Sequence, residues 1–286
     1  MFSILELVGR LVPAIDIVDV GAMWFGQEHL AYKGLLKKGL GRVVGFEPVQ
    51  AECDKLNALG MAGHRYLPYF IGDGTERTFY LTNQSMTASL YEPNTALLAK
   101  FHNIEELTRT VETCKVQTRR MDDLAELAAI DFLKADVQGA ELDVFKGATR
   151  LLQGTVVVET EVEFAPMYKG QPLFADVDAF LRSQGFAFHT FSSTSAVMFK
   201  PLVVRGDPTA TLRQQLWANA VYVKDYMALS GLSPEQLLKY AVIMHEVYQS
   251  YDLAGVALAE YDAKTKAGIG PVYLKRVAGH SIAARR

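Results

Sequence analysis

Short apolar runs and stretches with helical spacing alternate along the first two thirds of the chain. The runs typical of buried strands lie at 17–20, 43–46, 66–71, 130–136 and 155–161. Alternation of strands and helices predicts βαβ units, and hence a mostly parallel sheet with helices on both faces. We therefore expect a doubly wound α/β sheet.

Other segments are expected to complete this sheet. The pattern at 78–82 predicts an exposed strand after a hairpin turn at 72–76, and 111–120 predicts a further strand. The runs at 186–191 and 195–199 predict a β-hairpin at the last edge. Helices are expected over 27–38, 49–59, 95–108, 139–152 and 176–183, and Asp122 is expected to cap a short helix ending at Ala129.

The pattern changes to helix alone near residue 208. Residues 200–208 resemble a linker, 209–229 is expected to be a helix, and Ser233-Pro234-Glu235-Gln236 has the order of a capped helix N-terminus. We therefore predict an α/β domain over 1–200 and a helical C-terminal extension over 209–286. The extension could pack on the sheet, cover a substrate pocket or form a homodimer interface.

Composition excludes several classes of protein. The formal net charge of −3 over 286 residues gives no basic footprint for nucleic acid. The two cysteines, Cys53 and Cys114, fit no metal or redox spacing, so a reducing cytoplasm is the simplest setting. No window is long and apolar enough to span a membrane, and charged residues interrupt 1–17, which predicts an amphipathic helix and no signal peptide.

The opening unit has the features of a nucleoside site. The strand at 17–20 runs into Gly21, and the strand at 43–46 ends on Glu47. A glycine turn lets the backbone approach a ligand, and a carboxylate at the second strand end can accept hydrogen bonds from ribose hydroxyls. Acidic residues also lie at or near the ends of the other predicted strands, where such sheets bind ligands: Asp19, Asp73, Asp136, Glu159 and Glu161.

The segment Ile130–Ala148, IDFLKADVQGAELDVFKGA, resembles the signature of the FkbM family of S-adenosylmethionine-dependent O-methyltransferases. Supporting matches follow in the family's order and together extend the resemblance over about 17–200: VDVGA at 18–22, FEP at 46–48, IGD at 71–73, SL at 89–90, MDDL at 121–124 and MYKGQPLFADVDAFLRSQGF at 167–186. The resemblance implies a Rossmann-like class I methyltransferase sheet with a reversed hairpin at its edge.

The resemblance also implies where S-adenosylmethionine would bind. The stretch from Asp19 to Gly26, including Gly21 and Ala22, would line the methionine and ribose portion, and Asp136 would lie where the donor's amino group and the transferring methyl meet. The other implied positions are Glu47 with Pro48 at the ribose hydroxyls, Asp73 with Gly72 at the adenine edge, Gln138 and Glu141 close to Asp136, and Glu161 on the acceptor side.

The turn after the first strand departs from the family pattern. The family has an asparagine after GA and a glycine two residues later, whereas Met23 and Phe25 hold those places here and Gly26 comes one residue late. The turn therefore carries an extra residue or is built differently.

Methyl transfer to a hydroxyl needs alignment of donor and acceptor and benefits from a base. Asp136 or Glu161 could be that base, and His189 is a more distant candidate; a raised pKa would suit either carboxylate. The alternatives are that Asp136 only binds the donor's ammonium group and that Glu161 only orders its loop. Structural alternatives also remain for three further residues: Glu141 as a first-turn helix acid, Lys134 as a strand lysine that reaches solvent and His245 as a packed histidine. No metal is expected, because Asp136-Val137-Gln138 has no partner motif.

The predicted function is therefore methyl transfer from S-adenosylmethionine to a hydroxyl of a sugar, glycan precursor or other small metabolite. One alternative is an NAD(P)-dependent oxidoreductase, although the three-glycine fingerprint is absent and Pro48 follows the acid. Another is a non-catalytic S-adenosylmethionine-binding protein that acts through its helical extension, which the altered turn at 22–26 would favour.

Overall fold

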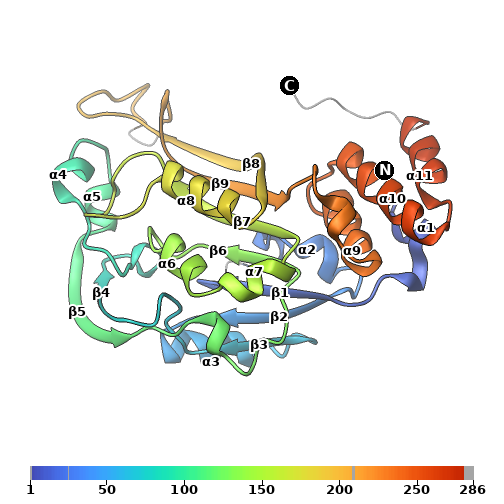
Figure 1. The fold of residues 1–286 in the computed structure, drawn as a ribbon. Helices are drawn as coiled ribbons and strands as arrows, with labels where there is room; N and C mark the ends of the chain where they lie inside the picture. The colour runs from blue at the N-terminus through green and yellow to red at the C-terminus, as the bar shows by residue number, and fades with distance from the viewer. Residues whose placement is uncertain (1, 25, 208–209, 280–286) are drawn as a thin grey trace.

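The protein is built on a seven-stranded sheet with the order β3-β2-β1-β6-β7-β9-β8 (Figure 1). The computed structural model describes residues 2–24, 26–207 and 210–279. The strands are β1 (Ile15–Val20), β2 (Gly41–Phe46), β3 (His64–Leu67), β6 (Phe132–Ala135), β7 (Val157–Glu163), β8 (Phe186–Val197) and β9 (Gln214–Lys224). All run parallel except β9, which is antiparallel to both of its neighbours. The predicted doubly wound sheet is confirmed, and its one reversed strand, β9, lies next to the edge strand β8.

The central strands form because alternate apolar side chains are buried on both faces of the sheet. In β1, Ile15 and Ile17 belong to one apolar cluster, whereas Val18 and Val20 belong to the cluster on the other face. The strand order reverses between β1 and β6, which both pair with parallel neighbours. In an open α/β sheet this reversal opens a crevice at the carboxyl ends of the strands.

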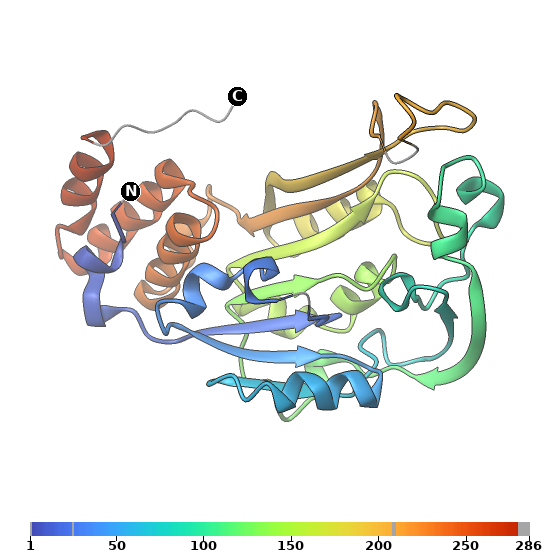
Figure 2. The same cartoon turned by 180° about the vertical axis from the view of Figure 1, so that it is seen from behind.

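Helices cover both faces of the sheet. On one face lie α6 (Glu141–Lys146), α7 (Thr149–Gly154) and α8 (Phe174–Ser183), which are in front in Figure 1. On the other face, α2 (Lys33–Leu36) packs with α9 (Pro234–Glu246), while α3 (Gln50–Ala58) lies beside β3 (Figure 2). A separate antiparallel pair, β4 (Glu76–Thr82) and β5 (Thr110–Gln117), lies beyond the carboxyl ends of the central strands.

The helices α9, α10 (Tyr251–Thr265) and α11 (Ile269–Ala278) lie at the amino end of the sheet with α1 (Leu5–Val8), opposite α4 (Thr95–Leu98) and α5 (Ile104–Leu107) (Figures 1 and 2). The start of α9 has the predicted capping box, in which Ser233 and Gln236 exchange hydrogen bonds. Residues 237–245 of α9 are all buried. Of the three roles left open for this segment, the structure shows packing on the sheet.

The predicted helix at 209–229 is wrong, because Gln214–Lys224 forms strand β9. Both faces of this strand are covered, with Ala218, Ala220 and Tyr222 in one apolar cluster and Val221 and Val223 in the other. The predicted hairpin at 186–191 and 195–199 is also wrong, since these residues form the single strand β8, which pairs with β9. The division of the chain expected between 200 and 209 therefore falls within the sheet, although residues 208–209 lie outside the described residues.

Several shorter elements also differ from expectation. The helix expected over 27–38 is reduced to η2 (Gln27–His29) and α2, with the fully buried Tyr32 between them. The helix expected over 95–108 is two short helices, α4 and α5, and the one over 139–152 breaks into α6 and α7. The hairpin at 72–76 does not form, since β4 pairs with β5. A single amphipathic helix was expected over 1–17, of which residue 1 lies outside the described residues. The structure has instead the short helix α1, a 3₁₀ turn (Gly9–Leu11) and the start of β1.

Asp122 caps a different helix from the one predicted. Its carboxylate accepts hydrogen bonds from the backbone N–H groups of Arg150 at 2.8 Å and Leu151 at 3.0 Å, in the first turn of α7. Asp122 itself lies in the 3₁₀ turn Met121–Asp123, and no helix follows that turn up to Ala129.

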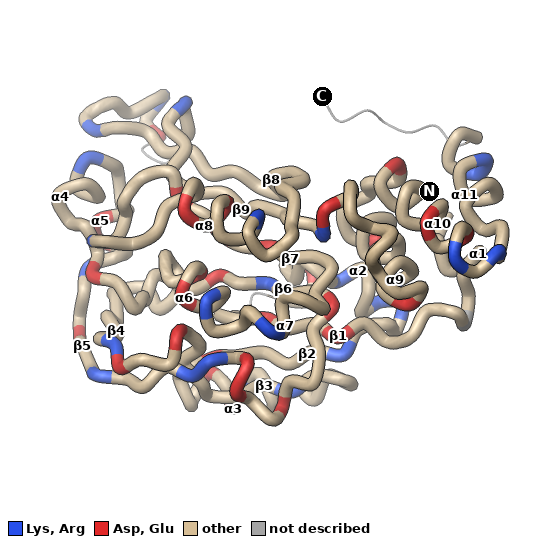
Figure 3. Tube along the Cα trace, in the orientation of Figure 1, with Lys and Arg blue, Asp and Glu red and all other residues tan. Residues whose placement is uncertain are grey.

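Acidic and basic residues are mixed along the whole trace (Figure 3). This mixture agrees with the small net charge of −3. Among the described helices, none combines the length and the apolar character that a membrane crossing requires.

Candidate active site

A cavity of about 370 Å³ opens at the carboxyl ends of the central strands. Its walls include Val20 and Gly21 after β1, Glu47 after β2, Asp136 after β6 and Glu161 near the end of β7. The cavity therefore lies at the point where the strand order reverses, where open α/β sheets bind their ligands. Its volume is in the range of small-molecule sites.

Gly21 allows the loops after β1 and β6 to touch. It has a φ of +80°, and a Cβ atom there would lie 1.9 Å from the backbone oxygen of Asp136. The N–H groups of Gly21 and Ala22 both donate to the carbonyl oxygen of Phe46 at 3.0 Å. Only glycine fits this position, because any side chain would separate the two strand ends.

Glu47 presents a carboxylate to the cavity at the end of β2. The residue is only 6% exposed, and its Oε1 accepts a 2.8 Å hydrogen bond from the N–H of Val49. Within the described chain this N–H is the one hydrogen-bond partner of the Glu47 carboxylate. Burial raises the pKa of Glu47. An acid held in this way can accept further hydrogen bonds from a ligand's hydroxyl groups.

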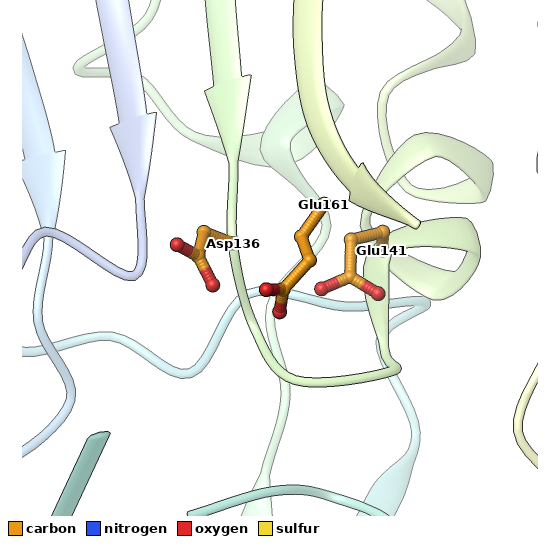
Figure 4. Close-up of side chains that lie close together, drawn as sticks. All are labelled: Asp136, Glu141 and Glu161. Carbon is orange, nitrogen blue, oxygen red and sulfur yellow. The ribbon is translucent and has the colours of Figure 1, made fainter. Parts of the chain in front are cut away.

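Three carboxylates meet beside the loop after β6 (Figure 4). An oxygen from each of Asp136, Glu141 and Glu161 lies within 4.8 Å of the others. The side-chain amide of Gln138 lies between two of them, donating to Asp136 Oδ1 at 3.1 Å and to Glu161 Oε2 at 2.6 Å. An amide nitrogen therefore occupies the place that a cation bridging Asp136 and Glu161 would need. The absence of a metal remains a prediction.

Gln138 is fixed by contacts on both its side chain and its backbone. Its Oε1 accepts a hydrogen bond from the hydroxyl of Tyr168 at 3.0 Å, and its carbonyl oxygen accepts one from Ser89 Oγ at 2.6 Å. Its φ of +55° is uncommon for a residue other than glycine, so the neighbouring contacts must hold this loop in place. The amide is thus positioned before any ligand binds.

Three of the acids, Glu161, Glu163 and Glu141, hold their protons more strongly than usual. Burial, and then the charges of Asp136, Glu163 and Glu141, raise the pKa of Glu161 well above its ordinary value. Burial and the charges of Glu141 and Asp136 do the same to the pKa of Glu163. Burial raises the pKa of Glu141 to about 7, despite its hydrogen bonds from the N–H groups of Val137 and Gly139. A carboxyl group that titrates near neutral pH can take up a proton during catalysis.

The structure brings six of the predicted residues to the cavity walls: Gly21, Glu47, Pro48, Asp136, Gln138 and Glu161. Asp19 is not among the described lining residues. Its buried carboxylate accepts hydrogen bonds from Tyr32 at 2.8 Å and Lys134 at 3.1 Å. Although burial opposes it, the charges of Asp19 and Asp136 raise the pKa of Lys134. The expectation that Lys134 reaches solvent holds only in part, because its side chain is 20% exposed and this ion pair holds it against β1.

The remaining predicted residues lie outside the walls. Asp73 uses its carboxylate to bind Thr75 in its own turn, and Gly72 packs against Thr118 and Gly147. Glu141, the first residue of α6, lies beneath the loop after β6, where its carboxylate accepts hydrogen bonds from the N–H groups of Val137 and Gly139.

Ala22 is buried with Cys53, Leu56 and Tyr66, and Gly26 begins the η2 turn. Of the unusual turn at 22–26, Met23 lines the cavity, and Phe25 lies outside the described residues.

Both histidines considered from the sequence are bound elsewhere. His189 lies 2.6 Å from Ser250 Oγ and does not line the cavity, so its place does not support a role as base. His245 is 3% exposed and contacts Tyr273 and the backbone of Phe2, which confirms the packed histidine.

Sequence reasoning missed Glu163, Tyr168 and Trp217. Glu163 lies two residues beyond Glu161 on the same strand, so it faces the same side of the sheet and lines the cavity. The alternation of Glu159, Glu161 and Glu163 was the signal that could have identified it. Trp217 belongs to β9, which was taken for a helix, and the contact of Tyr168 with Gln138 joins residues 30 positions apart.

Comparison with known proteins agrees with this geometry. A model of the methyltransferase FkbM domain matches residues 19–188, which is more than half of the chain. The 2-O-methyltransferase NoeI of Sinorhizobium fredii (strain NBRC 101917 / NGR234) is 45% identical over 67 residues, covering 22% of this chain and 28% of that protein. The match therefore spans less than a third of that relative's length.

Two solved structures have similar folds at low identity. A putative methyltransferase from Thermoplasma acidophilum is 10% identical with a TM-score of 0.38, covering 74% of this chain and 69% of its own. Precorrin-6y C5,15-methyltransferase from Geobacter metallireducens GS-15 is 13% identical with a TM-score of 0.36, covering 77% and 85%. At these scores the likenesses add nothing to what the strand order of this chain already shows.

Proposed function

The chain belongs to the FkbM family of S-adenosylmethionine-dependent methyltransferases, and we propose that it methylates a hydroxyl oxygen of a small molecule, such as a sugar. The observation that carries this proposal is the pair Asp136 and Glu161, joined by Gln138 at the switch-point cavity. The relative named as a 2-O-methyltransferase supports an oxygen acceptor. Family membership removes the reason for the oxidoreductase alternative.

Residues at the β1 and β2 side of the cavity suit a nucleoside donor. Gly21 lets the loops after β1 and β6 meet at the cavity wall, and Glu47 has acceptor capacity left for ribose hydroxyls. Asp136 lies on the same side and offers its carboxylate to the donor's ammonium group. S-adenosylmethionine supplies a methyl group on a cationic sulfonium, so an acidic cavity favours its binding.

Glu161 is the residue we assign as general base. As the acceptor oxygen forms its bond to the methyl carbon, the carbon–sulfur bond breaks, and the hydroxyl proton passes to the Glu161 carboxylate. The raised pKa of Glu161 suits this step, because a more basic carboxylate accepts the proton more readily. Gln138 holds the carboxylate through Oε2 and so orients Oε1.

The test is transfer of radiolabelled methyl groups from S-adenosylmethionine to matched alcohol, amine and thiol acceptors. We expect labelled ethers as products, and we expect Glu161→Gln to lower kcat about a hundredfold, as the loss of a general base does, while donor affinity stays within about twofold. Transfer to amines or thiols in place of alcohols would contradict the proposal. Tight binding of S-adenosylhomocysteine with no turnover on any acceptor would favour the non-catalytic alternative.

A further inference from the structure

Part of the cavity wall is apolar, and we call this part the second chamber. Phe79 and Leu81 of β4 and Leu90 line it, in a cluster with Phe70 and Val137. Ile104 and Leu107 of α5, together with Met167 and Trp217, also line it. These residues come from segments outside the β1–β2 donor side, so the second chamber is where an acceptor would lie.

Three hydroxyl groups of this chamber, those of Thr108, Ser89 and Thr87, already donate hydrogen bonds within the protein. Thr108 Oγ donates to the carbonyl oxygen of Ile104 at 2.8 Å, and Ser89 Oγ donates to that of Gln138 at 2.6 Å. Thr87 Oγ likewise donates to backbone carbonyl groups. The chamber therefore offers an acceptor few polar partners beyond the carboxylates.

The charge of the cavity has one sign. Among the described residues that line it there is no lysine, arginine or histidine, whereas five carboxylic acids are present: Glu47, Glu52, Asp136, Glu161 and Glu163. A phosphate group of an acceptor would meet Glu161 and Glu163, and none of the described lining residues is a cation that could pair with it. Anionic acceptors are therefore disfavoured by repulsion and by the loss of their hydration.

Apolar side chains also reach solvent at this end of the cavity. Met86 in the η3 turn (Ser85–Thr87) is 50% exposed and Leu107 is 40% exposed, although both line the cavity. Such side chains continue the apolar wall outward, so a ligand longer than the chamber can extend between them.

We propose that the acceptor is an uncharged hydroxyl compound bearing an alkyl or aryl group, whose apolar part fills this second chamber and whose hydroxyl faces Glu161. Nucleotide-linked and phosphorylated sugars are excluded as acceptors. This inference rests on the proposed function, because it assigns the donor to the β1–β2 side.

The test uses N-phenyl-1-naphthylamine, a neutral apolar dye whose fluorescence rises on burial, with protein saturated with S-adenosylhomocysteine. We expect the dye to bind the saturated protein and to be displaced by octyl glucoside but not by methyl glucoside or glucose 6-phosphate. Met86→Asp and Leu107→Asp should each weaken dye binding at least about tenfold, since a charge replaces an apolar contact and would lose hydration when the dye covers it. Met227→Asp is the matched control, because Met227 is 83% exposed and does not line the cavity, and it should leave binding unchanged.

The other possible results would each contradict either this proposal or the proposed function. The proposal is overturned if the dye does not bind, if S-adenosylhomocysteine displaces it, or if glucose 6-phosphate competes as well as octyl glucoside. It is also overturned if folded Met86→Asp and Leu107→Asp proteins, checked by thermal melting, bind the dye as the Met227→Asp control does. If calorimetry detects no S-adenosylhomocysteine binding while the dye pattern holds, the proposed function fails and the apolar ligand class stands.

Discussion

At the scale of single residues, the position of Gln138 explains how acids can gather at the end of β6. Its amide donates to both Asp136 and Glu161, and Tyr168 fixes it from the other side. Hydrogen bonds from one amide lessen the repulsion between the two carboxylates but leave no full positive charge between them. The result is a carboxylate that is both held in place and unusually basic.

The raised pKa of Glu161 predicts the pH dependence of methyl transfer. The base must be ionised, so the rate should fall as pH decreases through a pKa well above that of an ordinary glutamate. In Glu161→Gln, the remaining activity should lose this acid limb. Initial rates between pH 5 and 9 at saturating donor test the prediction. An unchanged pH–rate profile in the variant would show that another residue is the base.

Glu141 should make the folded protein less stable as pH rises. Its pKa is about 7 in the folded chain against an ordinary value of 4.5, so its stabilising contribution is complete below 4.5 and is lost as pH rises through about 7. Between pH 5 and 8 the wild type should lose on the order of 2 kcal/mol more unfolding free energy than Glu141→Gln. Glutamine can still accept from Val137 and Gly139. Urea unfolding at both pH values measures this, and parallel losses in the two proteins would refute it.

The sequence could predict which residues lie at the carboxyl edge of the sheet, but not where each of their side chains points. Glu47, Asp136 and Glu161 follow apolar runs, so their place at the carboxyl edge of the sheet could be predicted from those runs alone. The direction of a side chain depends on partners distant in the chain. Asp19 turns to Lys134, which is 115 residues away, and no local pattern records that pair.

At the scale of elements, strand β9 and helix α9 are the segments that most changed the expected architecture. The run from Leu216 to Val223 mixes alanine with β-branched and aromatic residues, and a segment buried on both faces has no clear period. Neighbouring strands β7 and β8 therefore decide its conformation. In contrast, Ser233 and Gln236 make a local capping box, so the start of α9 was predicted correctly.

Helix α9 is tied to the sheet by a buried ion pair. Lys239 Nζ lies 2.9 Å from Asp131 Oδ2, and this carboxylate also accepts the N–H of Asp16 at 2.7 Å. Lys239→Met leaves Asp131 buried without its cation and should cost about 3 kcal/mol of unfolding free energy, measured by urea denaturation.

Two variants control for this prediction. Combining Lys239→Met with Asp131→Asn should cost less than the sum of the two single changes, because no charge is left buried. Lys264→Met removes an exposed lysine from α10 and should change stability by no more than about 0.5 kcal/mol. If the double substitution lowers the free energy of unfolding by the sum of the two single substitutions, the ion pair does not hold α9 to the sheet.

At the scale of the whole molecule, the two ends of the sheet differ in what they carry: packed helices at the amino end and the cavity at the carboxyl end. The amino end is covered by α1 and α9–α11, which contribute no residue to the described walls of the cavity. The carboxyl end holds the cavity between the central strands and the β4–β5 and α5 segments. A change in acceptor specificity would therefore require substitutions only at the carboxyl end of the sheet.

A homodimer through the C-terminal helices remains a prediction, for which light scattering is the measurement.

The account depends on the switch-point cavity binding the methyl donor, and calorimetric titration with S-adenosylhomocysteine tests this most directly. We predict one site per chain, with affinity lowered at least about tenfold in Glu47→Ala, since a buried carboxylate that accepts ligand hydroxyls is lost. Affinity should be unchanged in Asp54→Ala, which removes an exposed acid of the adjacent helix α3. No binding by the wild type, or equal affinity in folded Glu47→Ala and Asp54→Ala, would contradict the account.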